Sequence, residues 1–263
     1  FMKVMDVIQL LEQEGTWLQR DFQTRDHLLY GSEEAQVHKI GVCWVATIKV
    51  LQEAAAQRID FIITHENPFY QCSTQMHTAA YDAAQKKRQL LKQYGISIYR
   101  YHDVWDCIRE YGVADQWARL LGFPFEMREQ ASYYQAATIP KTSLEALAKH
   151  TAKVLRKDGE DGVYVFGNPQ SIVNRIVIGT GAATGLYEML KLHPDAVIVC
   201  DDGITNYDAA QYALDHAIGM VVVNHAAVER SGLQAMVPWL QKRTQNQAVQ
   251  WLDDGFHIHY YTG

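Results

Sequence analysis

Histidine and carboxylate side chains follow three apolar segments of this 263-residue sequence. These residues are His65 and Glu66 after DFIIT, His102 and Asp106 after ISIYRY, and His225 and Glu229 after GMVVVN. Imidazole nitrogens and carboxylate oxygens together form a ligand set that suits zinc, iron, manganese or nickel. His225 and Glu229 are four residues apart, so a helix that begins directly after the preceding segment would place both on one face. The pattern predicts a site for divalent metal ions.

The segments that must position these side chains alternate between helical periodicity and short apolar runs. Such runs are typical of strands buried on both faces of a sheet, which predicts an α/β fold. Ligands bind at the carboxyl ends of strands in such sheets, where Asp103, Asp201 and Asp202 also fall. We expect strands at 38–48, 60–65, 96–102, 174–181, 195–201 and 219–225. We expect helices at 4–14, 49–58, 79–95, 106–121, 144–157, 186–192, 206–217 and 231–243.

The stretch 122–143 contains two prolines and no helical period, so we expect a crossover with one strand there. It is the best candidate for a boundary between two α/β domains, 1–123 and 124–263, between which a strand can be exchanged. Thr142 and Glu145 have the spacing of a capping box for the helix that follows. Two further strands are expected at 248–252 and 256–261, the second placing His257 and His259 on one face of an exposed edge.

The charge balance and the cysteine spacing exclude several classes of protein. Lys plus Arg number 24 and Asp plus Glu 30, a net charge of −6, so nucleic acid is not expected as the partner. No stretch reaches the roughly 20 apolar residues of a membrane span, and the opening segment turns acidic too early for a signal peptide. We therefore expect a cytoplasmic protein with no membrane partner. Free thiols are predicted because no C-x-x-C pair joins the four cysteines, Cys43, Cys72, Cys107 and Cys200.

Four motifs in order give the sequence a family resemblance. They are T-H-E-N-P-F-Y at 64–70, Y-H-D-V-W-D at 101–106, D-D-G-I-T-N-Y-D-A at 201–209 and N-H-A-A-V-E-R at 224–230. The set resembles the Nif-three-like family of dinuclear-metal hexamers, whose members are also known as type 2 GTP cyclohydrolase I. The resemblance carries metal-ligand roles over to His65, Asp106, His225 and Glu229. Glu66 stands where the family has a second histidine, and Tyr207 where it has another.

The resemblance implies two intertwined α/β domains with mixed, largely buried sheets, assembled into a toroidal homohexamer as a trimer of dimers or as stacked trimers. It also implies two divalent ions per subunit, with Glu66 among the ligands. Two ions that share a water lower its pKa, so we expect hydrolysis of a nucleotide or another small heterocyclic or phosphorylated substrate. Glu66 and His102 are the expected catalytic residues. His102 can orient Asp106, contact the substrate or move a proton, or it can simply cap a strand end.

Two other classes of function stay open: a non-enzymatic metal-binding scaffold or regulatory hexamer, and a metal-free binding protein whose strand-end acids only cap helices. The run T-G-A-A-T-G at 180–185 either presents backbone amides to a phosphate or serves a tight turn. The loop residues Phe69, Tyr70 and His77 either cover a heterocyclic substrate or pack against a neighbouring subunit.

Overall fold

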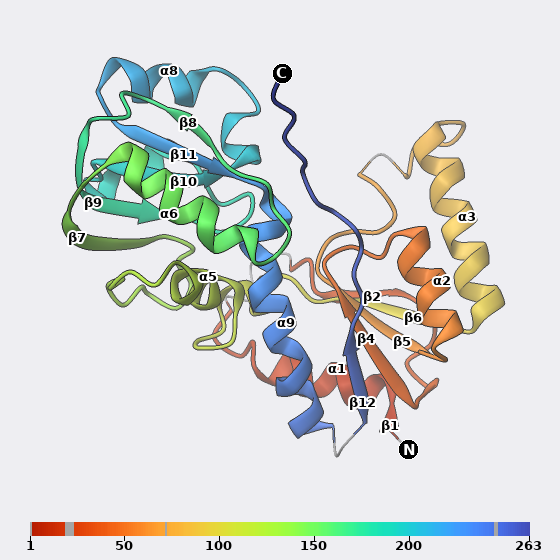
Figure 1. The fold of residues 1–263 in the computed structure, drawn as a ribbon. Helices are drawn as coiled ribbons and strands as arrows, with labels where there is room; N and C mark the ends of the chain where they lie inside the picture. The colour runs from red at the N-terminus through yellow and green to blue at the C-terminus, as the bar shows by residue number, and fades with distance from the viewer. Residues whose placement is uncertain (1, 19–23, 72, 245–246) are drawn as a thin grey trace. The chain divides into compact units, whose positions relative to one another are not determined.

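The computed structural model describes residues 2–18, 24–71, 73–244 and 247–263, which divide into two α/β units (Figure 1). The first unit is Phe1–Gly112 with Leu233–Gly255, and the second is Val113–Gly232 with Phe256–Gly263. The chain therefore passes between the units three times. This division differs from 1–123 and 124–263, because the strand near residue 250 pairs with the sheet of the first unit. Each unit contains one five-stranded mixed sheet, which confirms the mixed α/β fold.

The sheet of the first unit has the strand order β12-β4-β5-β6-β2. Its parallel strands are β4 (Lys39–Cys43), β5 (Phe61–Thr64), β6 (Ser97–Arg100) and β12 (Ala248–Trp251), and β2 (His27–Tyr30) runs antiparallel at one edge. The helices of this unit are α1 (Val4–Gln13), α2 (Ile48–Ala56), α3 (Ala79–Tyr94) and α4 (Asp103–Cys107). Every residue of β5 is buried, as expected for a strand covered on both faces. Because β5 and β6 are parallel neighbours, the residues that follow them meet at one edge.

Two short strands, β1 (Met2–Lys3) and β3 (Gln36–Val37), form a separate antiparallel pair in the first unit. Thr47 caps α2 by accepting a hydrogen bond from the Val50 amide, and Gly95 ends α3 in the left-handed region at φ +67°. The glycine end agrees with the helix expected at 79–95. The strand expected at 38–48 is too long, because β4 ends at Cys43 and Thr47 caps a helix whose first residue is Ile48.

The sheet of the second unit has the order β7-β9-β10-β11-β8. Its strands are β7 (Gln135–Ser143), β8 (Tyr164–Phe166), β9 (Ile172–Ile178), β10 (Ala196–Cys200) and β11 (Gly219–Val223), of which β9, β10 and β11 are parallel. The helices are α5 (Val113–Leu121), α6 (Leu144–Arg156), α7 (Leu186–Met189), α8 (Asp208–Asp215) and the start of α9 (His225–Arg243), with short 3-10 turns at Leu190–Leu192 and Asp201–Ile204. One residue, Asn224, separates β11 from α9, so the helix begins at His225 rather than at residue 231 as expected.

The expected single helix at 106–121 is wrong, because the chain forms α4 and α5 with a break between them. Ile108 ends α4 in an extended conformation, with φ −57° and ψ 131°. Gly112 lies so close to the preceding turn that a Cβ there would be 2.4 Å from the carbonyl oxygens of Trp105 and Ile108. Only glycine fits this approach, and Asp106 consequently lies within a short helix of its own.

Two smaller expectations are also wrong. Ser143, not Thr142, caps α6: it is the last residue of β7 and directly precedes the helix, and its side chain accepts a hydrogen bond from the Ala146 amide. Residues 256–261 form no strand; instead His257 Nδ1 lies 3.3 Å from a carboxylate oxygen of Glu160. The described cysteines, Cys43, Cys107 and Cys200, are buried thiols that form no disulfide, in agreement with the predicted thiols, whereas Cys72 lies outside the described residues. Across the described part of the chain, no helix has the length and apolar character needed to cross a membrane.

Candidate metal centre

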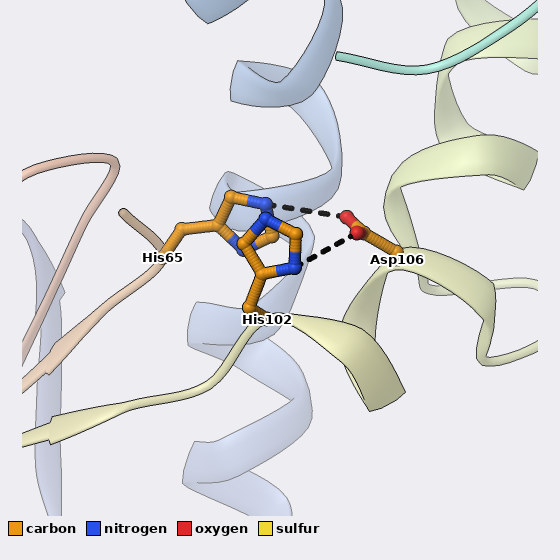
Figure 2. A group of neighbouring side chains, drawn as sticks. All are labelled: His65, His102 and Asp106. Atoms are coloured by element: carbon orange, nitrogen blue, oxygen red, sulfur yellow. Dashed lines mark ion pairs between the residues drawn. The ribbon is translucent and has the colours of Figure 1, made fainter. Parts of the chain in front are cut away.

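Two histidines and one aspartate of the first unit converge at the carboxyl ends of β5 and β6 (Figure 2). His65 Nε2 lies 3.2 Å from Asp106 Oδ1, and His102 Nδ1 lies 3.1 Å from Asp106 Oδ2. The two imidazole rings stack with centroids 4.3 Å apart and an interplanar angle of 9°. Both His65 and Asp106 are buried. Ligand atoms this close, drawn from nitrogen and oxygen donors, are suited to a divalent cation.

The position of Asp106 depends on Asp26, which anchors the start of α4. The Asp26 carboxylate accepts hydrogen bonds from the backbone amides of His102, Asp103 and Val104 at 2.7, 2.8 and 3.1 Å. A side chain distant in sequence thus satisfies the amides that the helix leaves without internal partners. Burial raises the pKa of Asp26, and the three amides oppose that rise by stabilising the charged form.

The hydrogen bonds around His65 fix which of its nitrogens faces the carboxylate. Its Nδ1 lies 3.1 Å from the carbonyl oxygen of Tyr101, which can only accept a hydrogen bond, so the proton is on Nδ1 and Nε2 points toward Asp106. Metal-binding histidines characteristically donate their other nitrogen to a carbonyl or carboxylate in this way. The geometry of His65 therefore fits a metal ligand.

His102 is surrounded by carboxylates that favour its protonated form. Burial lowers the pKa of His102, but Asp106, Asp103 and Glu66 outweigh it and raise the pKa to about 9. Burial also opposes ionisation of Asp103, yet hydrogen bonds from His102 and Arg25 hold the pKa of that carboxyl well below its usual range. The carboxylates around His102 thus concentrate negative charge at this site, which favours a positively charged partner.

Glu66 forms an ion pair with Arg100 and also lies beside His102. Arg100 donates to Glu66 Oε2 at 2.8 Å and to the backbone carbonyl of His65 at 3.0 Å. The other oxygen, Glu66 Oε1, lies 3.5 Å from His102 Nε2. The arginine holds one oxygen of the carboxylate and fixes its orientation beside the histidine pair.

The buried oxygen Asp106 Oδ1 is the observation that best tests whether a cation fits here. It accepts no hydrogen bond from any residue that the structure describes, although it is shielded from water. Burying a carboxylate oxygen in this way is costly unless a positive charge neutralises it. The residues present therefore fit a divalent ion.

The second unit carries a matching group at the end of β10 and the start of α9. His225 Nε2 lies 3.0 Å from Glu229 Oε1 one helical turn away, and His225 Nδ1 lies 2.9 Å from Asp202 Oδ1. Cys200, Asp202 and His225 also offer ligand atoms within 4.8 Å of one another. Burial lowers the pKa of His225, but Glu229 and Asp202 raise it to about 12. Asp202 fixes the imidazole as an orienting carboxylate does in metal sites.

Gly181 has no side chain, and the atoms of Glu229 and His225 occupy the space where a side chain would lie. Gly181 has φ +49°, and a Cβ there would lie 1.9 Å from Glu229 Oε1 and 2.6 Å from His225 Nε2. The run 180–185 therefore brings backbone against these ligand atoms, which is the structural reason for its first glycine. A residue with a side chain at position 181 would collide with these ligand atoms.

Other residues behave differently from what the sequence suggested. Phe69 is buried in the core of the first unit, and Arg88 lies 4.1 Å above its ring, so Phe69 does not cover a substrate. Tyr70 and His77 are exposed. Sequence reasoning missed the roles of Asp26 and Arg100, since neither follows a strand-end motif. Asp202 did follow such a strand, and this signal could have paired it with His225.

Taken together, the fold and the two groups define a class of α/β protein with buried histidine and carboxylate clusters at the ends of parallel strands. Residues 2–253 match the family Duf34/NIF3 (NGG1p interacting factor 3), and the chain belongs to this family. The expected resemblance is thereby confirmed.

Solved structures with the same fold cover nearly the whole chain. Protein ybgI, of unknown function, is 21% identical with a TM-score of 0.79 and covers 99% of this chain and 100% of its own. The hypothetical protein SA1388 of Staphylococcus aureus is 18% identical with a TM-score of 0.80, covering 99% of each chain. A Bacillus cereus protein related to NIF3 is 14% identical with a TM-score of 0.78, again covering 99% of each. At these identities the likeness establishes the fold. No curated protein matches the sequence.

Proposed function

We propose that this chain is a metal-dependent hydrolase that binds two divalent ions per subunit. The proposed ligands are His65 and Asp106 of the first unit and His225 and Glu229 of the second. The observation that carries the proposal is Asp106 Oδ1, a buried carboxylate oxygen that faces an imidazole nitrogen at 3.2 Å and accepts no hydrogen bond from the described residues. A divalent cation supplies the positive charge that this oxygen lacks.

Bound divalent ions would supply the acidification of water and the polarisation of a carbonyl or phosphoryl oxygen. Glu66 is the proposed proton acceptor, because Arg100 holds its Oε2 and leaves Oε1 directed toward His102 Nε2. Glu66 is also the remaining candidate for a metal ligand. The adjacent guanidinium opposes that role, since it would bring a positive charge close to the ion.

A nucleotide or another small heterocyclic or phosphorylated molecule is the proposed substrate, and the toroidal homohexamer is the proposed assembly. Both rest on the order of the four motifs rather than on a contact in the structure. Light scattering coupled to size-exclusion chromatography measures the assembly directly: a mass near six subunits supports the hexamer, and a monomer refutes it.

Metal content tests the proposal first. Protein purified without a chelator or a histidine tag should contain close to two divalent ions per subunit by elemental analysis. Asp106→Ala and His225→Ala should each lower that content, because each removes a ligand from a different group. Finding no ion in the wild type would refute the proposal, and unchanged content in both variants would place the ions elsewhere.

Turnover separates the enzyme from the alternative, a non-enzymatic metal-binding scaffold or regulatory hexamer. The metal-loaded protein should hydrolyse members of a panel of nucleotides, phosphoesters and cyclic amides, and Glu66→Gln should reduce the rate more than the metal content. Protein that retains its metal but turns over no compound of the panel would favour the scaffold.

A further inference from the structure

Glu160 is a buried carboxylate of the second unit that the proposed function does not use. Its side chain is only 1% exposed, and three groups surround its Oε1. Asn224 Nδ2 lies 3.1 Å from this oxygen, His257 Nδ1 lies 3.3 Å from it, and a guanidinium nitrogen of Arg230 lies 3.5 Å from it. The other oxygen, Oε2, is buried and accepts no hydrogen bond from the residues that the structure describes. Two separate segments of the chain therefore hold this carboxylate through one oxygen.

Two of these groups flank the proposed ligands of the second unit. In the motif N-H-A-A-V-E-R, Asn224 directly precedes His225, and Arg230 directly follows Glu229. Both flanking residues are buried, and both side chains contact Glu160. Glu160 therefore holds the segment that carries the two ligands at both of its ends.

Asn224 connects Glu160 to the backbone at the start of α9. Its Oδ1 accepts a hydrogen bond from the Ala226 amide at 3.1 Å, and its carbonyl oxygen accepts from the amides of Ala227 and Val228 at 3.0 and 3.2 Å. The side-chain oxygen thus caps the helix by satisfying an amide that has no partner within it. The nitrogen of the same side chain donates to Glu160, which fixes the amide plane with its oxygen toward the helix.

The C-terminal segment completes the surroundings of Glu160. The carbonyl oxygen of Phe256 accepts a hydrogen bond from Arg230 at 3.1 Å, and His257 lies against the carboxylate. A second guanidinium nitrogen of Arg230 donates to the carbonyl oxygen of Asp158 at 3.1 Å. The Glu160 carboxylate neutralises this buried guanidinium, and a buried charge is costly without such a partner. The position of Arg230 on α9 therefore depends on Glu160.

We propose that Glu160 is a positioning residue for the metal ion of the second unit. Through Asn224 and Arg230 it fixes the start of α9, and therefore the two proposed ligands on that helix. This inference rests on the proposed function, which assigns an ion to those ligands. Metal–ligand distances tolerate changes of only about 0.2 Å, so a helix start that is held less firmly weakens binding. Partners outside the ligands contribute about 10–100-fold to metal affinity in other metal sites.

Glu160→Ala and Asp161→Ala form a matched pair of variants. Asp161 also holds the C-terminal segment, because it accepts a hydrogen bond from the Tyr260 amide at 3.1 Å. Asp161 is exposed, and the hydrogen bonds that it accepts from described residues come from that segment. Both variants should loosen the C-terminal segment, but only Glu160→Ala changes the surroundings of α9. Glu160→Gln is the conservative variant, since one of its oxygens can still accept from Asn224.

Hydrogen exchange in the metal-free full-length protein tests the positioning directly, and mass spectrometry follows it in peptides that cover 224–230. In Glu160→Ala the amides of 226–228 should exchange at least ~10-fold faster than in the wild type, because the cap is no longer held. Asp161→Ala should leave their exchange unchanged, and Glu160→Gln should be intermediate. Wild-type exchange in Glu160→Ala, or equal acceleration in Asp161→Ala, would overturn the inference.

Zinc calorimetry tests the consequence for the metal centre. The ion of the second unit is identified as the one that His225→Ala fails to bind. Its affinity should fall about 10–100-fold in Glu160→Ala and keep the wild-type value in Asp161→Ala, while the affinity for the other ion is unchanged in both. Wild-type zinc affinity in Glu160→Ala would overturn the inference. A wild type that binds no zinc would instead refute the proposed function, and hydrogen exchange would still show whether Glu160 fixes α9.

If Glu160→Ala does not fold, Asn224→Ser breaks the same connection from the other side. Serine caps helices about as well as asparagine, but it lacks the amide nitrogen that reaches Glu160. The affinity for the zinc ion of the second unit should therefore fall at least ~10-fold although α9 keeps a capping residue. Wild-type affinity in Asn224→Ser would overturn the inference.

Discussion

Gly181→Ala should remove metal binding at the second group while the protein stays folded. The new Cβ would lie 1.9 Å from Glu229 Oε1 and 2.6 Å from His225 Nε2. To reach ordinary contact, the glutamate oxygen must withdraw by about 1.5 Å, several times the ~0.2 Å tolerance of a metal–ligand distance. Both atoms end flexible side chains that can swing aside, so the geometry of the ligands is lost at little cost in packing.

The magnitudes follow from these distances and from the backbone. Alanine at φ +49° costs about 1–2 kcal/mol in the free energy of unfolding, because a Cβ in the left-handed region crowds the following carbonyl. Displacement of a carboxylate and an imidazole should weaken the ion at this group at least ~100-fold, which corresponds to about 3 kcal/mol of binding. The effect on metal affinity thus exceeds the effect on stability.

Two control variants separate the contributions. Gly122 has φ +74° with no atom within 4 Å of a built Cβ, so Gly122→Ala measures the backbone cost alone. Gly185 lies in the same run, and its nearest contact would be 3.6 Å, so Gly185→Ala should leave metal binding unchanged. Urea unfolding and zinc calorimetry are measured on all three variants. Wild-type zinc affinity in Gly181→Ala would refute the reasoning.

Two further predictions concern buried groups of the first unit. Lys87 donates to the carbonyl oxygens of Ala46 and Pro68, and burial lowers its pKa from 10.5 to about 8. Between pH 8 and 10.5 the lysine is protonated in the unfolded chain but not in the folded one. The free energy of unfolding of the wild type should therefore rise with pH over this range, compared with that of Lys87→Met, by at most about 3 kcal/mol. Parallel pH profiles of the two proteins would contradict this. Asp26→Ala should lower the free energy of unfolding, measured in urea, by about 2–3 kcal/mol and should lower the zinc affinity about 10–100-fold. Asp26→Asn should be intermediate, because one side-chain oxygen still accepts hydrogen bonds. Wild-type zinc affinity in Asp26→Ala would show that α4 needs no such anchor.

Local signals predicted most of the elements of both units. The buried strands β4, β5, β6, β9, β10 and β11 were predicted from their apolar runs, α1 from its amphipathic pattern and α3 from the glycine that ends it, whereas only the later part of α9 was predicted. The short strands β1, β2, β3 and β8 were not predicted, although β2 (HLLY) and β8 (YVF) consist largely of apolar residues. Each lies at a sheet edge or in a two-stranded pair, where pairing with a neighbour decides whether a strand forms. The break between α4 and α5 depends on how closely Gly112 approaches the preceding turn, which no local pattern encodes.

The same division holds for the candidate site. Histidine and carboxylate residues at three strand ends, and the four-residue spacing of His225 and Glu229, predicted that such side chains would cluster, because parallel strands end at a common edge, and the structure brings them together in two groups. The sequence could not predict that Arg100 holds Glu66, or that the rings of His65 and His102 lie parallel. Side-chain orientation at this range depends on contacts among residues far apart in the chain.

By itself the sequence determined the α/β class, the family and the residue types that can bind metal, because these follow from periodicity and from motifs within short segments. Only the tertiary structure decided which partner each oxygen of Asp106 faces. It also decided that Asp26, which is 76 residues before His102 in the sequence, fixes the start of the helix that contains Asp106. Such pairings are set when the ends of β5 and β6 and the start of α4 pack together. Their chemistry is therefore a property of the folded chain rather than of any one motif.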